Sequence, residues 1–320
     1  MSTSNYTTTP TKLSFALLAC IFAIVLFLEC QSTLASIKLS GGTQASESEF
    51  AGIVSIQYQS AADQAPSHFC GASIINARYI ITAAHCVQGI DLTKLVVIAG
   101  TSNNNCYKDT TGRCIVRTVS QVVAHPNFDV YTITNDIALV QLSQDLPLVT
   151  MSSKVKSFKL ESAKVPFGAQ LQIAGWGATQ NQGSSVNNLQ KGQIPLQQTS
   201  VCSQKQLTIS GPSQMCLGAG GSAQGVDICS GDAGSPAFYL NSKDSNAPVL
   251  VGIVSYGPAG CGGNNVGVYA NVTNYLPWIR SVTSDVLLSS YTSGNTPTPT
   301  PTPTPAASPR PNTDTDQCTC

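Results

Sequence analysis

The chain has 320 residues, of which 42% are hydrophobic and only 10% are charged, and its formal net charge is +0. This length suffices for one large β domain or two small ones with hydrophobic cores. A neutral, weakly charged chain lacks the positive surface that nucleic acids or anionic membrane surfaces attract, so we expect neither as a partner.

The N-terminus has the pattern of a secretory signal. Lys12 precedes an uncharged apolar run over residues 13–28, and small residues follow up to Ala35. This order predicts a signal peptide over residues 1–35, cleaved after Ala35. A signal anchor is the alternative, but the apolar run of about 16 residues is short against the roughly 20 that span a bilayer. We expect a secreted, extracellular protein that leaves the membrane once the signal is removed.

The cysteines favour disulfides over metal. None of the 12 cysteines belongs to a C-x-x-C pair, and the chain has only 3 histidines. Disulfides in an oxidising compartment are therefore the stronger interpretation, and we predict no metal site and no cofactor. Cys20 and Cys30 lie in or beside the signal, so we expect them to stay unpaired in the mature protein.

Residues 39–285 read as one all-β region. Short Val- and Ile-rich segments alternate with turns of Gly, Asn, Ser and Pro, which is typical of a sandwich or barrel. The expected strands include 52–58, 70–75, 79–84, 95–99, 137–142, 171–174, 249–255 and 267–272. One late helix is predicted from about Asn274, because Tyr275, Trp278 and Ile279 recur at helical spacing.

The composition changes in residues 286–320, which we assign to a linker and a cysteine-containing tail. Residues 296–305 are Thr-Pro repeats, which favour an extended stalk and suit O-glycosylation. Cys318 and Cys320 are close to each other and allow an intermolecular disulfide. A flexible end without a role is the alternative.

Three segments carry chemistry. Residues 82–86 read T-A-A-H-C, residues 135–139 read N-D-I-A-L, and residues 229–236 read C-S-G-D-A-G-S-P. Each alone has a plain structural explanation: a polar histidine near a strand end, an acid that starts a strand, and a glycine turn. Together and in this order they resemble the chymotrypsin/trypsin family of serine proteases (peptidase S1), whose motifs read T-A-A-H-C, D-I-A-L and G-D-S-G-G-P. The resemblance extends to residues 175–177, 255–257 and 267–272.

The resemblance implies a fold and a set of roles. The family fold is two antiparallel six-stranded Greek-key β-barrels with a short C-terminal helix, and the site lies in the cleft between the barrels. His85 would be the general base and Asp136 the group that orients it. Residue 233 would be the nucleophile, and the backbone N–H groups of Gly231 and residue 233 would form the oxyanion hole.

The residue at the nucleophile position is Ala233. A methyl group cannot attack a carbonyl, so no acyl-enzyme can form there. Deleting the serine of a related protease lowers turnover roughly 2 × 10⁶-fold, on the order of 8 kcal/mol of transition-state stabilisation. Ser230 and Ser235 are displaced along the chain, and we do not expect either to replace it. The sequence therefore predicts a member of a serine-type endopeptidase family that is inactive as written.

Other family positions are kept. Asp227 matches the base of the specificity pocket, where an acid selects Lys or Arg, although a solvated loop acid is the alternative. Gly257 and Gly267 match the pocket walls, and Ser255 begins the edge that pairs with the substrate backbone. These positions predict a peptide or protein ligand that carries Lys or Arg.

The resemblance also implies activation and disulfides. Residues 36–38 would be a short propeptide, and cleavage after Lys38 would free the Leu39 amine to pair with Asp232. Leu39 and Ser40 depart from the family's I-V-G-G, which reduces the packing of that end. The implied disulfides are Cys70–Cys86, Cys202–Cys216 and Cys229–Cys261. Cys106 and Cys114 flank a short loop and would form a fourth bridge that the family does not share. The sequon at Asn271 falls at a strand end.

Three functions are compatible with these observations. The first is a secreted homologue that binds peptides or proteins without hydrolysis. It is similar to the glucanase inhibitor proteins of oomycetes, which keep the fold but lack a working triad, and its partner would then include a target enzyme that it inhibits. The second is an active trypsin-like endopeptidase that cleaves after Lys or Arg, with Ala233 a variant, an error or an introduced change. The third is a cell-wall or surface protein held on the Thr-Pro stalk.

Overall fold

The computed structural model describes residues 41–291 apart from 48, 220–225, 242, 244–246, 259 and 262–264. The predicted signal peptide, the propeptide with Lys38 and Leu39, and the tail from residue 292 onward lie outside the described residues.

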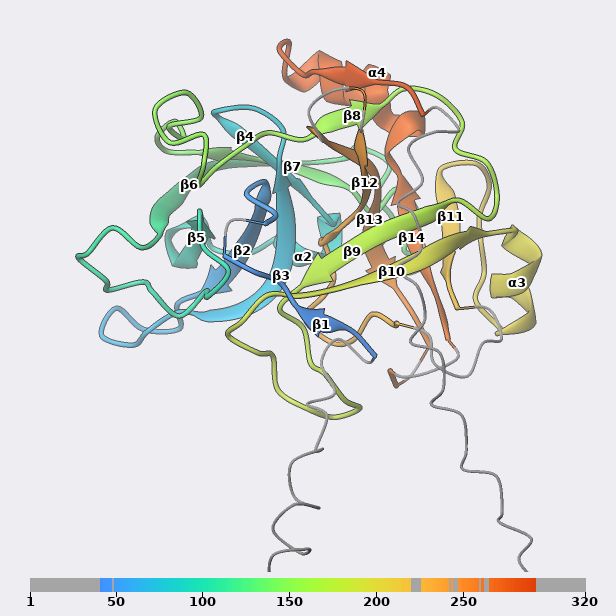
Figure 1. The fold of residues 1–320 in the computed structure, drawn as a ribbon, viewed down its shortest axis with the longest axis horizontal. Helices are drawn as coiled ribbons and strands as arrows, with labels where there is room; N and C mark the ends of the chain where they lie inside the picture. The colour runs from blue at the N-terminus through green and yellow to red at the C-terminus, as the bar shows by residue number, and fades with distance from the viewer. Residues whose placement is uncertain are drawn as a thin grey trace, which may run out of the picture. The chain divides into compact units, whose positions relative to one another are not determined.

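The first half of the described chain forms a closed barrel. Its strands follow the order β2-β3-β4-β7-β6-β5, and every neighbouring pair is antiparallel. The strands are β2 (Ile53–Tyr58), β3 (Ser67–Ile74), β4 (Tyr79–Thr82), β5 (Leu95–Ala99), β6 (Ile115–Ala124) and β7 (Ala138–Leu142). Because β4 pairs with β7 and not with β5, the connection is of the Greek-key type. Figure 1 shows this barrel in blue to green.

The second half forms another six-stranded antiparallel barrel, which β12 closes by pairing with both β9 and β13. Its strands are β9 (Gln170–Gly175), β10 (Gln190–Gln197), β11 (Gln214–Gly218), β12 (Pro236–Asn241), β13 (Ala247–Tyr256) and β14 (Val266–Asn271). Three short strands extend this sheet: β1 (Thr43–Gln44), β8 (Lys159–Glu161) and β15 (Leu288–Ser289). The two barrels confirm the fold expected from the family resemblance.

The helices within the described part of the chain are short. They are α2 (Ala84–Val87), the 3₁₀ turn η1 (Leu92–Lys94), α3 (Thr199–Gln204) and α4 (Val272–Val282). The strand expected over 79–84 ends at Thr82, because Ala83 is the extended residue that precedes α2. The late helix α4 starts slightly before the expected Asn274, and no helix of the described residues is long and apolar enough to cross a membrane.

One hydrophobic core joins the two barrels. Side chains of the first barrel pack with Phe238, Leu250 and Ile253 of the second in a single cluster. The ring of Phe238 lies edge-on to Phe50 at 5.1 Å and to Phe158 at 5.3 Å between centroids. Such aromatic pairs contribute about 0.5–1.5 kcal/mol each beyond the area they bury. This shared packing fixes the barrels against each other and so fixes the cleft between them.

The ordered strands continue past residue 285, where the sequence analysis placed the end of the domain. β15 pairs in parallel with β8, and the buried Glu161 accepts hydrogen bonds from the Tyr291 N–H and the Tyr239 hydroxyl. A buried carboxylate must accept hydrogen bonds to replace its lost water, so the segments that donate to Glu161, including Tyr291, are fixed in place. The segment up to Tyr291 is therefore part of the folded sheet.

The four implied disulfides are present: Cys70–Cys86, Cys106–Cys114, Cys202–Cys216 and Cys229–Cys261. The first joins β3 to α2, and the last joins the turn after Ile228 to the loop before β14. These two disulfides, Cys70–Cys86 and Cys229–Cys261, line the cleft and tie its walls to neighbouring segments.

Candidate active site

His85 and Asp136 come together from the start of α2 and the start of β7. His85 Nδ1 lies 2.7 Å from Asp136 Oδ2, and the His85 backbone N–H donates to Asp136 Oδ1 at 2.9 Å. The Asp136 side chain is 1% exposed, whereas the His85 side chain is 31% exposed. The buried acid thus fixes the orientation of an imidazole whose other edge is open to the cleft.

Ser255, at the end of β13, completes this network from the second barrel. Its hydroxyl donates to Asp136 Oδ2 at 2.5 Å. Asp136 therefore accepts hydrogen bonds from a side chain of each barrel, which compensates the loss of water around a buried carboxylate. The arrangement is that of a base held by an orienting acid.

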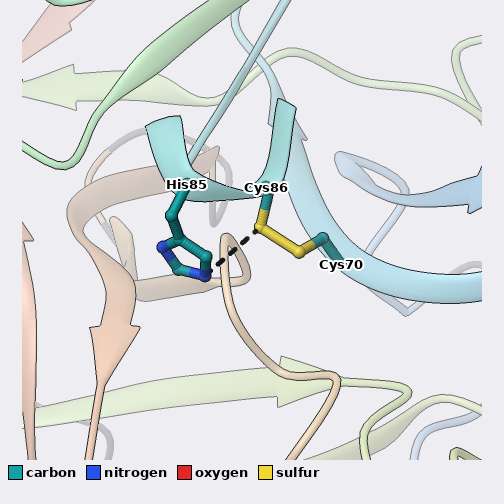
Figure 2. Close-up of side chains that lie close together, drawn as sticks. All are labelled: Cys70, His85 and Cys86. Atoms are coloured by element: carbon teal, nitrogen blue, oxygen red, sulfur yellow. Dashed lines mark hydrogen bonds between the residues drawn. A yellow bond between two sulfur atoms is a disulfide. The ribbon is translucent and has the colours of Figure 1, made fainter. Parts of the chain in front are cut away.

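On the side of the cleft, the Nε2 atom of His85 lies beside a disulfide. Figure 2 shows His85 Nε2 directed toward Cys86, with Sγ at 3.8 Å, and the bond from Cys86 to Cys70. These three residues are close enough to suit a metal ion by distance alone. Both sulfurs are oxidised into the disulfide, so the group offers one imidazole and no thiolate ligand.

Ala233 lines the same cleft as His85 and packs partly against the shared core. The serines beside it do not take its place. Ser235 is 2% exposed, and its Oγ has no hydrogen-bond partner among the described residues. A Cβ built on Gly71 would lie 2.0 Å from that Oγ, so the hydroxyl points into the packed interior. Ser230 lies in the cleft but makes no hydrogen bond with His85 among the described residues.

The turn over residues 229–235 presents two backbone donors. Gly231 has φ +93, a conformation that glycine adopts readily and other residues rarely do. The Gly231 carbonyl accepts from His68, and the Ala233 carbonyl accepts from the Gly71 N–H. The N–H groups of Gly231 and Ala233 donate to no other described residue. Both residues line the cleft, so these amides are suited to bind a carbonyl oxygen.

Asp232 is buried beneath this turn. Its carboxylate accepts from the Gly177 N–H and the Cys229 N–H, each at 2.9 Å. Burial raises the pKa of Asp232 to about 7, and repulsion by Asp227 adds to the increase. A Cβ on Gly175 would lie 2.2 Å from Asp232 Oδ1, so this position needs glycine. Among the described residues no cation forms an ion pair with Asp232.

A second histidine, which no sequence motif indicated, lies beneath the turn. His68 Nδ1 lies 2.7 Å from the Ser55 hydroxyl, and its Nε2 lies 2.9 Å from the Gly231 carbonyl. Burial lowers the pKa of His68 to about 4, so the ring is neutral at neutral pH and holds the turn as a hydrogen-bonding group. Its position just before Cys70 was the available signal, since the chain has only 3 histidines.

The cleft has a volume of about 550 Å³. Ser255 and Gly257 line one side of it, and residues 228–231 line the other. The described residues that line the cleft include Ile228 but neither Asp227 nor Gly267. Asp227 is 4% exposed and accepts from Asn265 Nδ2 at 3.2 Å. The structure therefore brings the predicted catalytic residues together, whereas the predicted pocket base, Asp227, is not among the described residues that line the cleft.

The trypsin family model matches residues 39–279. Trypsin eta of Drosophila erecta is 31% identical over 244 residues, which cover 76% of this chain and 89% of that protein. Trypsin delta of the same species is 33% identical over 247 residues, or 76% and 87% of the two chains. Trypsin Blo t 3 of Blomia tropicalis is 32% identical over 221 residues, or 68% and 78%. The match to the family model spans both barrels and the turn that carries Ala233.

Proposed function

Because the chain belongs to the trypsin family, whose members act on peptide or protein substrates, we propose that it is a secreted, non-catalytic member that binds peptides or proteins in its cleft. The observation that carries the proposal is the methyl group of Ala233 in a cleft where His85 is still held by the buried Asp136. A base with no hydroxyl beside it has no proton to take, so covalent catalysis cannot start. The backbone donors of the turn do not depend on the missing hydroxyl, so a peptide carbonyl can still bind.

Restoring one oxygen atom tests this proposal. The wild-type chain and Ala233→Ser are compared, after cleavage at Lys38, on peptide amides with Ala, Val, Lys or Arg before the scissile bond. We expect no turnover and no adduct with a serine-directed fluorophosphonate for the wild type, and both for the variant. Turnover by the wild-type chain that His85→Ala abolishes would contradict a non-catalytic role.

A second candidate is an active serine-type endopeptidase, in which Ala233 is a variant or an error. The complete network of His85, Asp136 and Ser255 favours it, since a binding protein has no need of an oriented base. Direct mass measurement of the secreted chain separates the candidates, because serine is heavier than alanine by one oxygen atom. An oxygen located at residue 233 by fragmentation would establish the second candidate.

We further propose that cleavage after Lys38 orders the turn over residues 229–235. The buried Asp232 carboxylate, with its raised pKa, is a place where a cation would bind strongly. By the family resemblance, this cation would be the N-terminal ammonium group of Leu39, which cleavage after Lys38 frees. Hydrogen exchange of the turn should slow on cleavage in the wild type and stay unchanged in Asp232→Asn.

Secretion and the partner follow from the same resemblance. Disulfides in the folded domain suit an oxidising compartment, which supports secretion. Because the chain is similar to glucanase inhibitor proteins, we propose that its partner is a secreted enzyme that it inhibits. Attachment to a cell wall through the Thr-Pro segment is the remaining proposal, and truncation after residue 291 should release the protein from that fraction. A Lys or Arg preference requires an open path to Asp227, and the position of Ile228 decides whether that path is open.

A further inference from the structure

We propose that Ile228 fills the specificity pocket, so that the cleft accepts a small apolar side chain such as Ala or Val and excludes Lys and Arg. This inference rests on the proposed binding function, because it names the kind of ligand that the same cleft takes. It replaces the sequence-based expectation of a Lys or Arg ligand.

The Ile228 side chain lies against the wall formed by Gly267 of β14. A Cβ built on Gly267 would lie 2.6 Å from Ile228 Cδ1 and 3.3 Å from Ile228 Cγ1. Carbon atoms in contact lie about 3.5–4.0 Å apart, so not even a methyl group fits between Ile228 and this wall. The room that the glycine leaves is therefore already occupied by the isoleucine.

The opposite wall is also within reach of Ile228. A Cβ on Gly257 would lie 3.5 Å from Ile228 Cδ1 and 3.8 Å from Ile228 Cγ1, which is ordinary van der Waals contact. The gap on this side therefore has room for a methyl group bonded to Gly257 itself, but not for a ligand carbon, which must keep contact distance from both residues, so a small ligand side chain would rest against the outer face of Ile228. A Lys or Arg stem passing between Gly257 and Ile228 would need contact distances on both of its sides, which a gap of this width does not provide.

Asp227, the residue before Ile228, is not among the described residues that line the cleft. It is 4% exposed and is hydrogen-bonded to Asn265. Ile228 is half-buried and packs against the hydrophobic cluster that contains Tyr269. This packing within the second barrel holds the Ile228 side chain in place. A ligand cation in the cleft would meet the isoleucine methyl groups first and would lose its water without gaining the carboxylate, which is unfavourable.

The test uses the secreted chain after cleavage at Lys38 and benzamidinium, a planar cation that resembles the end of an arginine side chain. Binding is measured by NMR titration for the wild type, Ile228→Ser, and Ile228→Ser combined with Asp227→Asn. Ile209→Ser is the matched control, because Ile209 is a partly buried isoleucine of another cluster in the second barrel. Thermal unfolding monitored by circular dichroism confirms that each variant is folded.

We expect no saturation of the wild type at about 10 mM benzamidinium, and at least about 30-fold tighter binding by Ile228→Ser, the factor that access to a buried charge partner provides. The added Asp227→Asn change should abolish the gain, and Ile209→Ser should behave as the wild type. Submillimolar binding by the wild type would overturn the proposal without any variant. A folded Ile228→Ser that binds no better than the wild type would overturn it too.

A second arm separates this inference from the binding function. Disulfide-cyclised peptides display Ala, Val or Arg at the residue directed into the pocket. The wild type should bind the Ala and Val peptides at least about 10-fold more tightly than the Arg peptide, and Ile228→Ser should reverse this order. A wild-type preference for Arg would overturn the inference and leave the binding function intact. Failure of every cyclic peptide to bind, with the benzamidinium result as expected, would sink the binding function and leave the closed pocket standing.

Discussion

Replacing Asp232 by Asn should change how stability depends on pH in the chain that is uncut at Lys38. The pKa of Asp232 is raised from 3.8 to about 7, first by burial and then by repulsion from Asp227. Between these two values the folded state keeps a proton that the unfolded state has released. The free energy of unfolding therefore falls as pH rises through this window, and it levels off above about pH 7.

The size of the effect follows from the shift. About three pKa units at about 1.36 kcal/mol each give a loss of about 4 kcal/mol between pH 4 and pH 8. Asparagine does not ionise, so Asp232→Asn removes this loss. The amide cannot accept both backbone donors with its single oxygen, which costs about 1 kcal/mol. We expect the variant to be about 1 kcal/mol less stable at pH 4 and about 3 kcal/mol more stable at pH 8.

His68 makes the comparison with the variant necessary. Burial lowers its pKa from 6.5 to about 4, so between these values the unfolded state holds more protons than the folded state. The free energy of unfolding then rises with pH, opposite to the Asp232 contribution. The wild-type curve alone combines both effects. The difference between wild type and Asp232→Asn isolates the carboxyl, because the His68 contribution is common to both proteins.

The assay is urea unfolding followed by tryptophan fluorescence at pH 4, 6 and 8, with Lys38→Gln in both proteins to prevent cleavage. Asp63→Asn, at an exposed loop position, is the matched control and should run parallel to the parent at every pH. Parallel curves for parent and Asp232→Asn would refute the reasoning, since they would show that Asp232 is ionised over the whole range without cost.

Three further predictions concern the catalytic pair, a glycine and a disulfide. In the Ala233→Ser background, Asp136→Asn should lower turnover about 10⁴-fold, measured in single-turnover assays, and an equal rate would show that the acid has no orienting role. Gly175→Ala would place a Cβ 2.2 Å from a buried carboxylate oxygen, and should lower stability by roughly 1–3 kcal/mol in urea unfolding. Replacing Cys106 and Cys114 together by Ser opens a cross-link of sequence separation 8 and should lower the free energy of unfolding by about 2–3 kcal/mol. An unchanged urea midpoint would show that the loop is held by other contacts.

The parts of the site that the sequence predicted are those set by short, local segments. His85 sits beside a cysteine that the fold ties to β3, and Asp136 directly precedes the apolar strand β7. In such segments the type and spacing of the residues are enough to indicate the chemistry. The register between strands then brings them together: Thr82 faces Ala138 where β4 pairs with β7, which places both segments at the same end of the barrel.

The parts that the sequence did not predict depend on contacts between distant segments. Whether Ile228 points into the pocket or the core is decided by Gly257 and Gly267, which belong to other segments of the second barrel. An isoleucine beside a buried acid has no local signal that separates these directions. Likewise, Ser55 and His68 meet because β2 and β3 pair with a shift in register between Ile56 and Gln57, and a β-bulge of this kind is not visible in the residue pattern.

The replacement of the family's serine by Ala233 lies at a side chain on which the fold does not depend. Asp136 keeps its donors, and Asp232 keeps its two backbone bonds, whatever stands at residue 233. Chemistry and ligand choice should therefore be separable by single changes. Ala233→Ser alone should hydrolyse peptides after Ala or Val, and Ala233→Ser with Ile228→Ser should hydrolyse them after Lys or Arg. Quantifying the cleavage sites of both variants on one denatured protein by mass spectrometry decides the matter. Cleavage after Lys or Arg by the single variant would mean that the isoleucine moves aside when a basic side chain enters.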